Sequence, residues 1–250
     1  MKLEICNIRK QYGKKIALDN LSYVFSPGVY GILGPNGAGK TTLMNLIASI
    51  LRPDKDSGRI YWNGKDIYKL GSLYREHIGY MPQQQNTYPS MSALRFMGYM
   101  SSLKGIDKHK SVELSKQLLE KVELLDVADK HIGGFSGGMK QRLLLASAMI
   151  GHPEILILDE PTAGLDPRQR VIIRDQIAQY GKDNIIIVVT HILSDIESIA
   201  DSIVMMRSGR IICEGNMDNI VKDENGQKIS LEKLYMNYYG ESLISESEEH

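Results

Sequence analysis

The chain has 250 residues, of which 42% are hydrophobic and 24% are charged, and 30 basic residues balance 30 acidic ones. This composition excludes disordered, collagen-like and disulfide-stabilised chains and is typical of one large or two small globular domains. Because the net charge is zero, no nucleic-acid ligand is expected.

Neither end of the chain nor its interior carries an obvious membrane segment. The start, MKLEICNIRK, lacks the apolar stretch of a signal peptide. The longest apolar runs, Ile155–Leu158 and Ile185–Val189, fall far short of the roughly 18 residues that span a bilayer. Cys6 and Cys213 lie far apart in strand-like stretches. We therefore expect a soluble protein of the reducing cytoplasm that reaches a membrane only through a partner.

The first third of the chain is predicted to be mainly β-structure. Strand-like runs occur at Leu3–Ile8, Lys15–Phe25 and Val29–Leu33. The Asn63-Gly64 pair within Gly58–Ile67 predicts a tight hairpin, because both residues tolerate positive φ. Thr41–Leu51 is predicted to form a helix that ends near Pro53.

The interval from about 88 to 150 is predicted to be a mostly helical insert. Leu114, Leu118, Val122 and Leu125 recur at spacings of four, four and three, which places them on one face of an amphipathic helix. Few runs of β-branched residues interrupt this interval.

After the insert, the pattern returns to alternating strands and helices. The runs Ile155–Leu158 and Ile185–Val189 are typical of parallel strands buried on both faces, with a helix predicted over Asp166–Tyr180 between them. Ile203–Met206 and Arg210–Glu214 are predicted to form a hairpin.

The C-terminal thirty residues are expected to form a small docked helix and a solvated acidic tail. The apolar stripe of that helix is Leu231, Leu234, Tyr235 and Tyr238. The tail follows at Glu241–His250.

Gly34–Thr41 reads GPNGAGKT and matches the phosphate-loop pattern G-x-x-x-x-G-K-[ST]. A strand-like run enters the segment and a helical run leaves it, which a plain glycine-rich turn would not require. Glycines let successive backbone N–H groups approach an anion, and the helix N-terminus adds partial positive charge. Lys40 is suited to the β and γ phosphates and Thr41 to Mg²⁺. The segment predicts binding of a nucleoside triphosphate.

ILILDE, at Ile155–Glu160, places two carboxylates where a buried parallel strand leaves its sheet. Open α/β sheets bind their ligands at that edge. Asp159 is suited to Mg²⁺, and Glu160 can accept a proton from the water that attacks the γ-phosphate. A strand that simply ends in solvated acids is the alternative, but the neighbouring phosphate loop favours hydrolysis.

Over about Met1–Gly215 the chain resembles an ATP-binding cassette (ABC) nucleotide-binding domain, because further motifs follow in that family's order. They are Gln83 in YMPQQ as the Q-loop glutamine, Phe135–Arg142 (FSGGMKQR) as the signature, ILILDEP as Walker B, Ala163–Asp166 as the D-loop and His191 as the switch histidine. Tyr12 stands where the family carries an aromatic residue that stacks on adenine.

The resemblance implies an α/β fold, a P-loop NTPase (RecA-like) core with an N-terminal antiparallel β subdomain and an inserted helical subdomain. The cassette would cover residues 1–220, with the helix and tail at 221–250. The implied catalytic residues are Glu160, His191 and Lys40. The implied nucleotide-binding residues are Tyr12, Gly34, Pro35, Asn36, Gly37, Ala38, Gly39, Lys40, Thr41, Thr42, Gln83, Ser136, Gly137 and Gly138, and the implied Mg²⁺ ligands are Thr41, Gln83 and Asp159.

The signature segment also makes sense as the start of a helix. Ser136 is a suitable N-cap for a helix running through Ile150, and its N–H groups form an anion site. The resemblance implies that this site contacts the γ-phosphate bound to the other subunit of a head-to-tail dimer. Phe135 and Met139 depart from the usual Leu and Gln, and Met cannot supply the hydrogen bonds of an amide.

Plainer interpretations exist for four of these residues. Gln83 could belong to a polar loop, and His191 could be a polar strand end. Asp166 could cap the following turn before Pro167, and Tyr12 could be a turn aromatic. The other histidines have no ligand spacing, so no zinc site is expected; they are His77, His109, His131, His152 and His250.

We expect an ATPase subunit of a membrane transporter that uses ATP and Mg²⁺ and pairs with separate transmembrane chains and a second cassette, identical or related. Thr190–Gly215 and the SGGM signature resemble subunits of drug, antibiotic-peptide and ABC-2-type exporters. Three alternatives remain: an importer subunit, a soluble ABC factor acting on ribosomes or DNA, and another kind of P-loop enzyme. The motif order speaks against the last.

Overall fold

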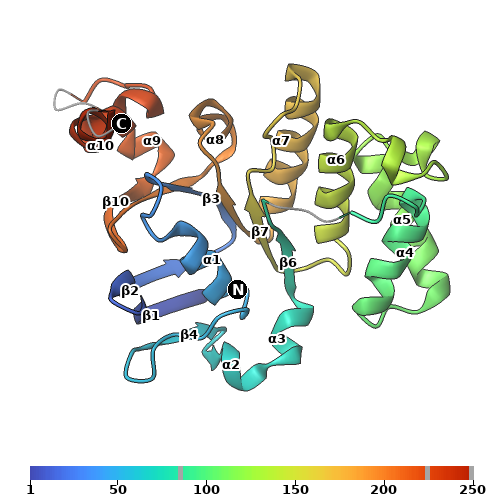
Figure 1. Ribbon diagram of the computed structural model, residues 1–250, viewed down its shortest axis with the longest axis horizontal. Coiled ribbons are helices and arrows are strands. Elements are labelled where there is room, and N and C mark those ends of the chain that lie inside the picture. Colours follow the sequence, from blue (N-terminus) through green and yellow to red (C-terminus); the bar gives the residue numbers. More distant parts are fainter. Residues whose placement is uncertain (84–86, 223–225, 248–250) are drawn as a thin grey trace.

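The computed structural model describes residues 1–83, 87–222 and 226–247. Two sheets share the left and centre of the molecule, and a group of helices extends from them on the right (Figure 1). Helix α10 (Leu231–Ser247) lies on the side away from these helices, and the N-terminus lies near the middle of the molecule (Figure 1). This is the expected α/β architecture with an antiparallel β portion near the N-terminus.

A four-stranded antiparallel sheet, in the order β2-β1-β4-β5, is built from the first third of the chain. Its strands are β1 (Leu3–Tyr12), β2 (Lys15–Phe25), β4 (Arg59–Trp62) and β5 (Lys65–Asp66). Asn63 and Gly64 adopt φ values of 48° and 76° between β4 and β5, which confirms the predicted hairpin.

A six-stranded sheet, in the order β10-β9-β3-β8-β7-β6, forms the centre. Its strands are β3 (Gly28–Leu33), β6 (Ile78–Met81), β7 (Ile155–Asp159), β8 (Ile185–Val189), β9 (Ser202–Arg207) and β10 (Arg210–Asn216). Adjacent strands are parallel except β9 and β10. Every residue of β3, β7 and β8 is buried, which explains why these strands are continuous apolar runs.

This sheet separates two apolar cores. Leu156 and Leu158 of β7 belong to one core, and Ile155 and Ile157 of the same strand belong to the other. Successive side chains of a strand point to opposite faces, so a strand covered on both sides must be apolar throughout. The paired cores hold the carboxyl ends of the parallel strands in fixed register.

The helices cover both faces of the central sheet or group beside it (Figure 1). They are α1 (Lys40–Ile47), α2 (Ile67–Leu70), α3 (Ser72–Glu76), α4 (Ala93–Leu103), α5 (Lys108–Lys121), α6 (Gly137–Ala148), α7 (Pro167–Gly181), α8 (Leu193–Ile199), α9 (Met217–Ile220) and α10 (Leu231–Ser247), with 3₁₀ turns η1 (Leu125–Val127) and η2 (Ile132–Gly134).

Three expectations need correction. Helix α1 ends at Ile47, short of the predicted Leu51, because Ser49 adopts a φ of 59° that a helix cannot contain. Helix α5 ends at Lys121, so Leu125 lies in η1 and is 36% exposed rather than on the buried face. Helix α10 continues through Ser247, into the segment expected to be tail.

Because β6 packs closely against α6, no side chain fits at Gly79, and this can be tested by substitution. A Cβ at Gly79 would overlap the carbonyl oxygen of Ala148 and lie 2.7 Å from a methyl carbon of Leu156. We expect Gly79→Ala to lower the free energy of unfolding by about 2 kcal/mol. Gly98 of α4 is the matched control, because a Cβ added there would lie 4.0 Å from the nearest atom, the Ser111 hydroxyl oxygen. Alanine is also the better helix former. Gly98→Ala should raise stability by about 0.5–1 kcal/mol. Urea titration checks both, and equal stability of the two variants would contradict the packing.

Candidate functional site

The loop between β3 and α1 has a backbone shape that depends on two glycines. Gly34 has a φ of 154°, and a Cβ there would overlap the carbonyl oxygen of Met206. Gly39, with a φ of 104°, is pressed against the carbonyl oxygen of Ala17 in the same way. The loop therefore fits into the sheet edge only without side chains at these points, which leaves its backbone close to any bound group.

Lys40 begins α1 and turns its ammonium group back over this loop. Its Nζ donates hydrogen bonds to the carbonyl oxygens of Gly34 at 2.6 Å and Pro35 at 2.9 Å. Burial lowers the pKa of Lys40, while the carboxylates of Glu160 and Asp159 act to raise it. The cation thus lies in the field of both acids at the end of β7.

Asp159 is the last residue of β7 and is 8% exposed. Burial, with a smaller contribution from Glu160, raises the pKa of Asp159 to about 6, and Lys40 opposes the shift. A carboxylate placed in this way is held ionised most easily by a nearby cation. Thr41 follows Lys40 in α1 and offers a hydroxyl oxygen to the same cleft.

Glu160 follows β7 in a left-handed conformation, with a φ of 52°. Its backbone N–H donates to the Val189 carbonyl at 2.8 Å. The Thr190 hydroxyl donates to Oε2 at 2.8 Å and the His191 backbone N–H to Oε1 at 3.1 Å. His191 Nδ1 lies 2.8 Å from Oε1, although its ring is otherwise largely exposed. The strand ends of β7 and β8 therefore fix the direction of the carboxylate.

These groups share one cleft of about 810 Å³ at the carboxyl edge of the central sheet. Its walls include all the residues that were expected to bind nucleotide within one chain: Tyr12, Gly34, Pro35, Asn36, Gly37, Ala38, Gly39, Lys40, Thr41, Thr42, Gln83, Asp159, Glu160 and His191. Ser136, Gly137 and Gly138 do not line it.

The signature residues instead begin α6. The Ser136 hydroxyl accepts a hydrogen bond from the Met139 N–H at 3.2 Å, as expected for an N-cap. Asp166 also acts as an N-cap, accepting from the Gln169 N–H at 2.9 Å, so the plainer interpretation of this residue describes its contact here.

The sequence patterns assigned several cleft residues no place in the nucleotide site. They are Lys15, Ala17, Val189, Thr190, Leu193 and Tyr235. Thr190 directly precedes His191, so its position next to a predicted site residue could have placed it in the cleft. Tyr235 comes from α10, far along the chain, and no local pattern connects it to the phosphate loop.

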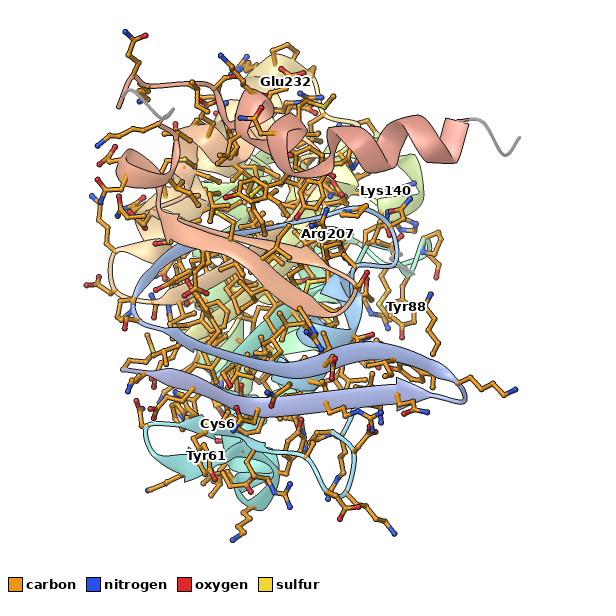
Figure 2. All side chains as sticks on the ribbon, turned by 90° about the vertical axis from the view of Figure 1, so that its left-hand side faces the viewer. Cys6, Tyr61, Tyr88, Lys140, Arg207 and Glu232 are labelled. Carbon is orange, nitrogen blue, oxygen red and sulfur yellow. The ribbon has the colours of Figure 1, made fainter. Side chains whose placement is uncertain are left out.

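Helix α10 is tied to the strand end that supports the phosphate loop. The Tyr239 hydroxyl donates to the Met206 carbonyl at 3.0 Å, and this is the carbonyl that Gly34 packs against. Arg207 donates from its guanidinium to the Tyr238 carbonyl at 3.2 Å, and Figure 2 shows Arg207 just below this helix. The predicted docked helix therefore packs beside the cleft.

The described part of the chain holds neither a cluster of metal-binding side chains nor a membrane-spanning helix. Within residues 1–83, 87–222 and 226–247, no group of three or more His, Cys, Asp or Glu side chains could form a metal site. In the same part of the chain, no helix has the length and apolar character needed to cross a membrane. A cation bound here would need oxygen ligands from its substrate as well.

The parallel sheet, the phosphate loop and the paired acids together define a P-loop NTPase. The chain belongs to the ABC transporter family, whose sequence profile it matches over residues 18–163. It is an ATP-binding and ATP-hydrolysing subunit of the kind that powers a membrane transporter.

Individual relatives agree with this assignment. The chain is 36% identical to the daunorubicin resistance ATP-binding protein DrrA3 of Streptomyces coeruleorubidus, over 89% of this chain and 70% of that protein. It is 33% identical to the Nod factor export ATP-binding protein I of Burkholderia lata, over 90% of this chain and 74% of that protein. A solved ATP-binding subunit of an ABC transporter superposes with a TM-score of 0.84 at 26% identity, covering 95% of this chain and 99% of that one.

The raised pKa of Asp159 makes a prediction about stability. The ordinary value is 3.8 and the folded value about 6, so the neutral form is favoured by folding. The resulting stability is fully present below pH 3.8 and is lost as the pH rises through 6. In nucleotide-free protein with EDTA, Asp159→Asn should therefore gain about 1 kcal/mol over the wild type between pH 5 and pH 8. Urea titrations at both pH values measure this gain, and a constant difference would contradict it.

Proposed function

We propose that the cleft binds ATP with its phosphates in the loop from Gly34 to Thr41, and that Glu160 and His191 carry out hydrolysis. The observation that carries this proposal is the clamp on Glu160, whose carboxylate is fixed by Thr190 and His191 at the edge of the cleft that Lys40 lines. Tyr12, at the end of β1 and 46% exposed in the same cleft, offers its ring to the adenine.

Different groups of the chain bind the phosphates and activate the attacking water. Backbone N–H groups of the loop and the N-terminus of α1 bind the phosphate oxygens. Lys40 exchanges its loop carbonyls for the β and γ phosphates, because a charged partner binds an ammonium group more strongly than a carbonyl does. Glu160 orients the attacking water and accepts its proton, while His191 holds Glu160 and reaches the γ-phosphate from its exposed ring.

Mg²⁺ fits the oxygen donors that line the cleft, namely the Thr41 hydroxyl, the Gln83 amide and the Asp159 carboxylate. When bound, it neutralises charge on the phosphates that flank the bond to be broken. One carboxylate with neutral oxygens suits Mg²⁺, which takes its remaining ligands from water and phosphate. The buried position of Asp159 favours a cation beside it, since ionisation there is otherwise costly.

The working unit we propose is a pair of cassettes, two copies or this chain with a relative. Ser136–Gly138 lie outside their own chain's cleft, yet they begin a capped helix with donors suited to an anion. Across a head-to-tail pair they would meet the γ-phosphate held by the partner. ATP then favours the closed pair, and loss of the γ-phosphate favours its opening.

We further propose that the pair is bound to separate transmembrane chains at the inner face of the cell membrane and powers export. Relatives named for drug resistance and Nod factor export support this direction. We place the groove that would receive the membrane chains near Gln83–Ser92, of which residues 84–86 lie outside the described part of the structure. Residues 1–220 would form the cassette, with its helical subdomain at about 88–150, and residues 221–250 its C-terminal helix and tail.

Replacing Glu160 by Gln tests the catalytic assignment. The substitution keeps the shape of the side chain but removes the base, so ATP hydrolysis should fall at least about 100-fold. ATP binding should persist, and an ATP-dependent dimer should accumulate on gel filtration. Glu120→Gln is the matched control, because Glu120 is exposed on α5. Hydrolysis at the control's rate in Glu160→Gln would refute the role.

The transporter assignment is tested by purifying the tagged chain from detergent-solubilised membranes of its own cells and identifying what accompanies it. We expect a polytopic membrane protein in stoichiometric amount. Recovery with ribosomes or DNA-binding proteins instead would support the soluble-factor alternative, and a membrane chain with a captured solute receptor would support import.

A further inference from the structure

Gln141 connects the signature helix to the backbone of the proposed catalytic glutamate. Its Nε2 donates a hydrogen bond to the Glu160 carbonyl oxygen at 2.7 Å. Gln141 lies in the second turn of α6, half-buried, and is 19 residues from Glu160 along the chain. No motif considered in the sequence assigns this side chain a role.

The hydrogen bond from Gln141 helps to hold Glu160 in its left-handed backbone conformation. A non-glycine residue is strained in the left-handed region, and surrounding contacts must hold it there. Contacts to Val189, Thr190 and His191 hold the N–H and the carboxylate from the β8 side. On the carbonyl, the Gln141 amide is a shorter contact than the Ala163 N–H, at 2.7 Å against 3.3 Å.

Helix α6 contacts the same segment a second time. A Cβ at Gly138 would overlap the side-chain amide of Gln169, so the first turn of α6 packs directly on α7. Gly138 and Gln141 are three residues apart and share a helix face, which therefore lies along the connection from Glu160 to Gln169. In Figure 1, α6 and α7 stand side by side next to β7.

A neighbouring side of α6 is fixed to the helical group. Arg142, the neighbour of Gln141, donates from Nη1 to the Val122 carbonyl at 2.7 Å and to the Glu123 carbonyl at 3.2 Å. A displacement of the helical group therefore moves α6, and with it the donor on the Glu160 carbonyl.

We propose that Gln141 is a positioning residue, which stabilises the left-handed backbone of Glu160. Through this contact the orientation of the Glu160 carboxylate depends on the position of α6. The proposal rests on the proposed role of Glu160. It gives each signature helix two tasks, presenting its N-terminus to the partner's phosphate and holding the glutamate of its own chain.

The test compares Gln141→Met and Gln141→Glu with the wild type in the full chain. Methionine keeps the length of the side chain without the donor, and glutamate keeps its shape while placing a charge against the carbonyl. We expect kcat for ATP hydrolysis to fall at least about tenfold in both, with KM and ATP affinity within about twofold of wild type. Gln117→Met is the matched control, since Gln117 pairs with Glu113 on the exposed face of α5.

A purely structural role predicts a different pattern. If Gln141→Met lowered ATP binding and kcat together, or left kcat within twofold of the control, the proposal would be wrong. The double variant Gln141→Met/Glu160→Gln should hydrolyse ATP no more slowly than Glu160→Gln alone, because both changes act through one carboxylate. Full activity of Glu160→Gln would instead refute the glutamate's role, while an inactive Glu160→Gln beside a fully active Gln141→Met refutes only this inference.

Discussion

The burial of two adjacent carboxylates at the end of β7 is the constraint on which the site depends. Asp159 and Glu160 are 8% and 9% exposed, and two buried like charges repel, so ionising both is costly unless a cation or hydrogen-bond donors lie beside them. Lys40 supplies the positive field, and Thr190 and His191 supply donors to Glu160. These partners follow two other strands, β3 and β8, so the register of both strands against β7 must be held tightly, which the two apolar cores on either side of the sheet achieve.

Much of the fold could be predicted because most of its strands have a recognisable sequence pattern. β7 and β8 are buried on both faces and are therefore unbroken apolar runs, and the turn between β4 and β5 needs positive φ at Asn63-Gly64. β6 was missed, because IGYM is short and contains a glycine that is required by contact with α6. The face of α5 was predicted from leucines, whereas its first turns bury Ser111 and Ser115, which only the packing of neighbouring helices reveals.

The residues of the site also fall into a group that the sequence predicts and a group that it does not. The residues proposed to bind phosphate, through backbone shape or a charged side chain, stand in local sequence patterns. The loop, the acids and His191 were therefore predictable, and they share one cleft. Tyr235 lines the cleft from a distant helix, and Gln141 contacts Glu160 through a backbone carbonyl. No spacing in the sequence encodes such contacts, since they depend on where whole elements pack.

The most direct test of this account is a structure of the Glu160→Gln protein with ATP and Mg²⁺. We predict two nucleotides between two cassettes, each with its γ-phosphate in hydrogen-bond reach of Lys40 of one copy and of the Ser136–Gly138 backbone of the other. A nucleotide whose phosphates lie outside the loop from Gly34 to Thr41, or a closed pair whose signature helices face away from the phosphates, would contradict it.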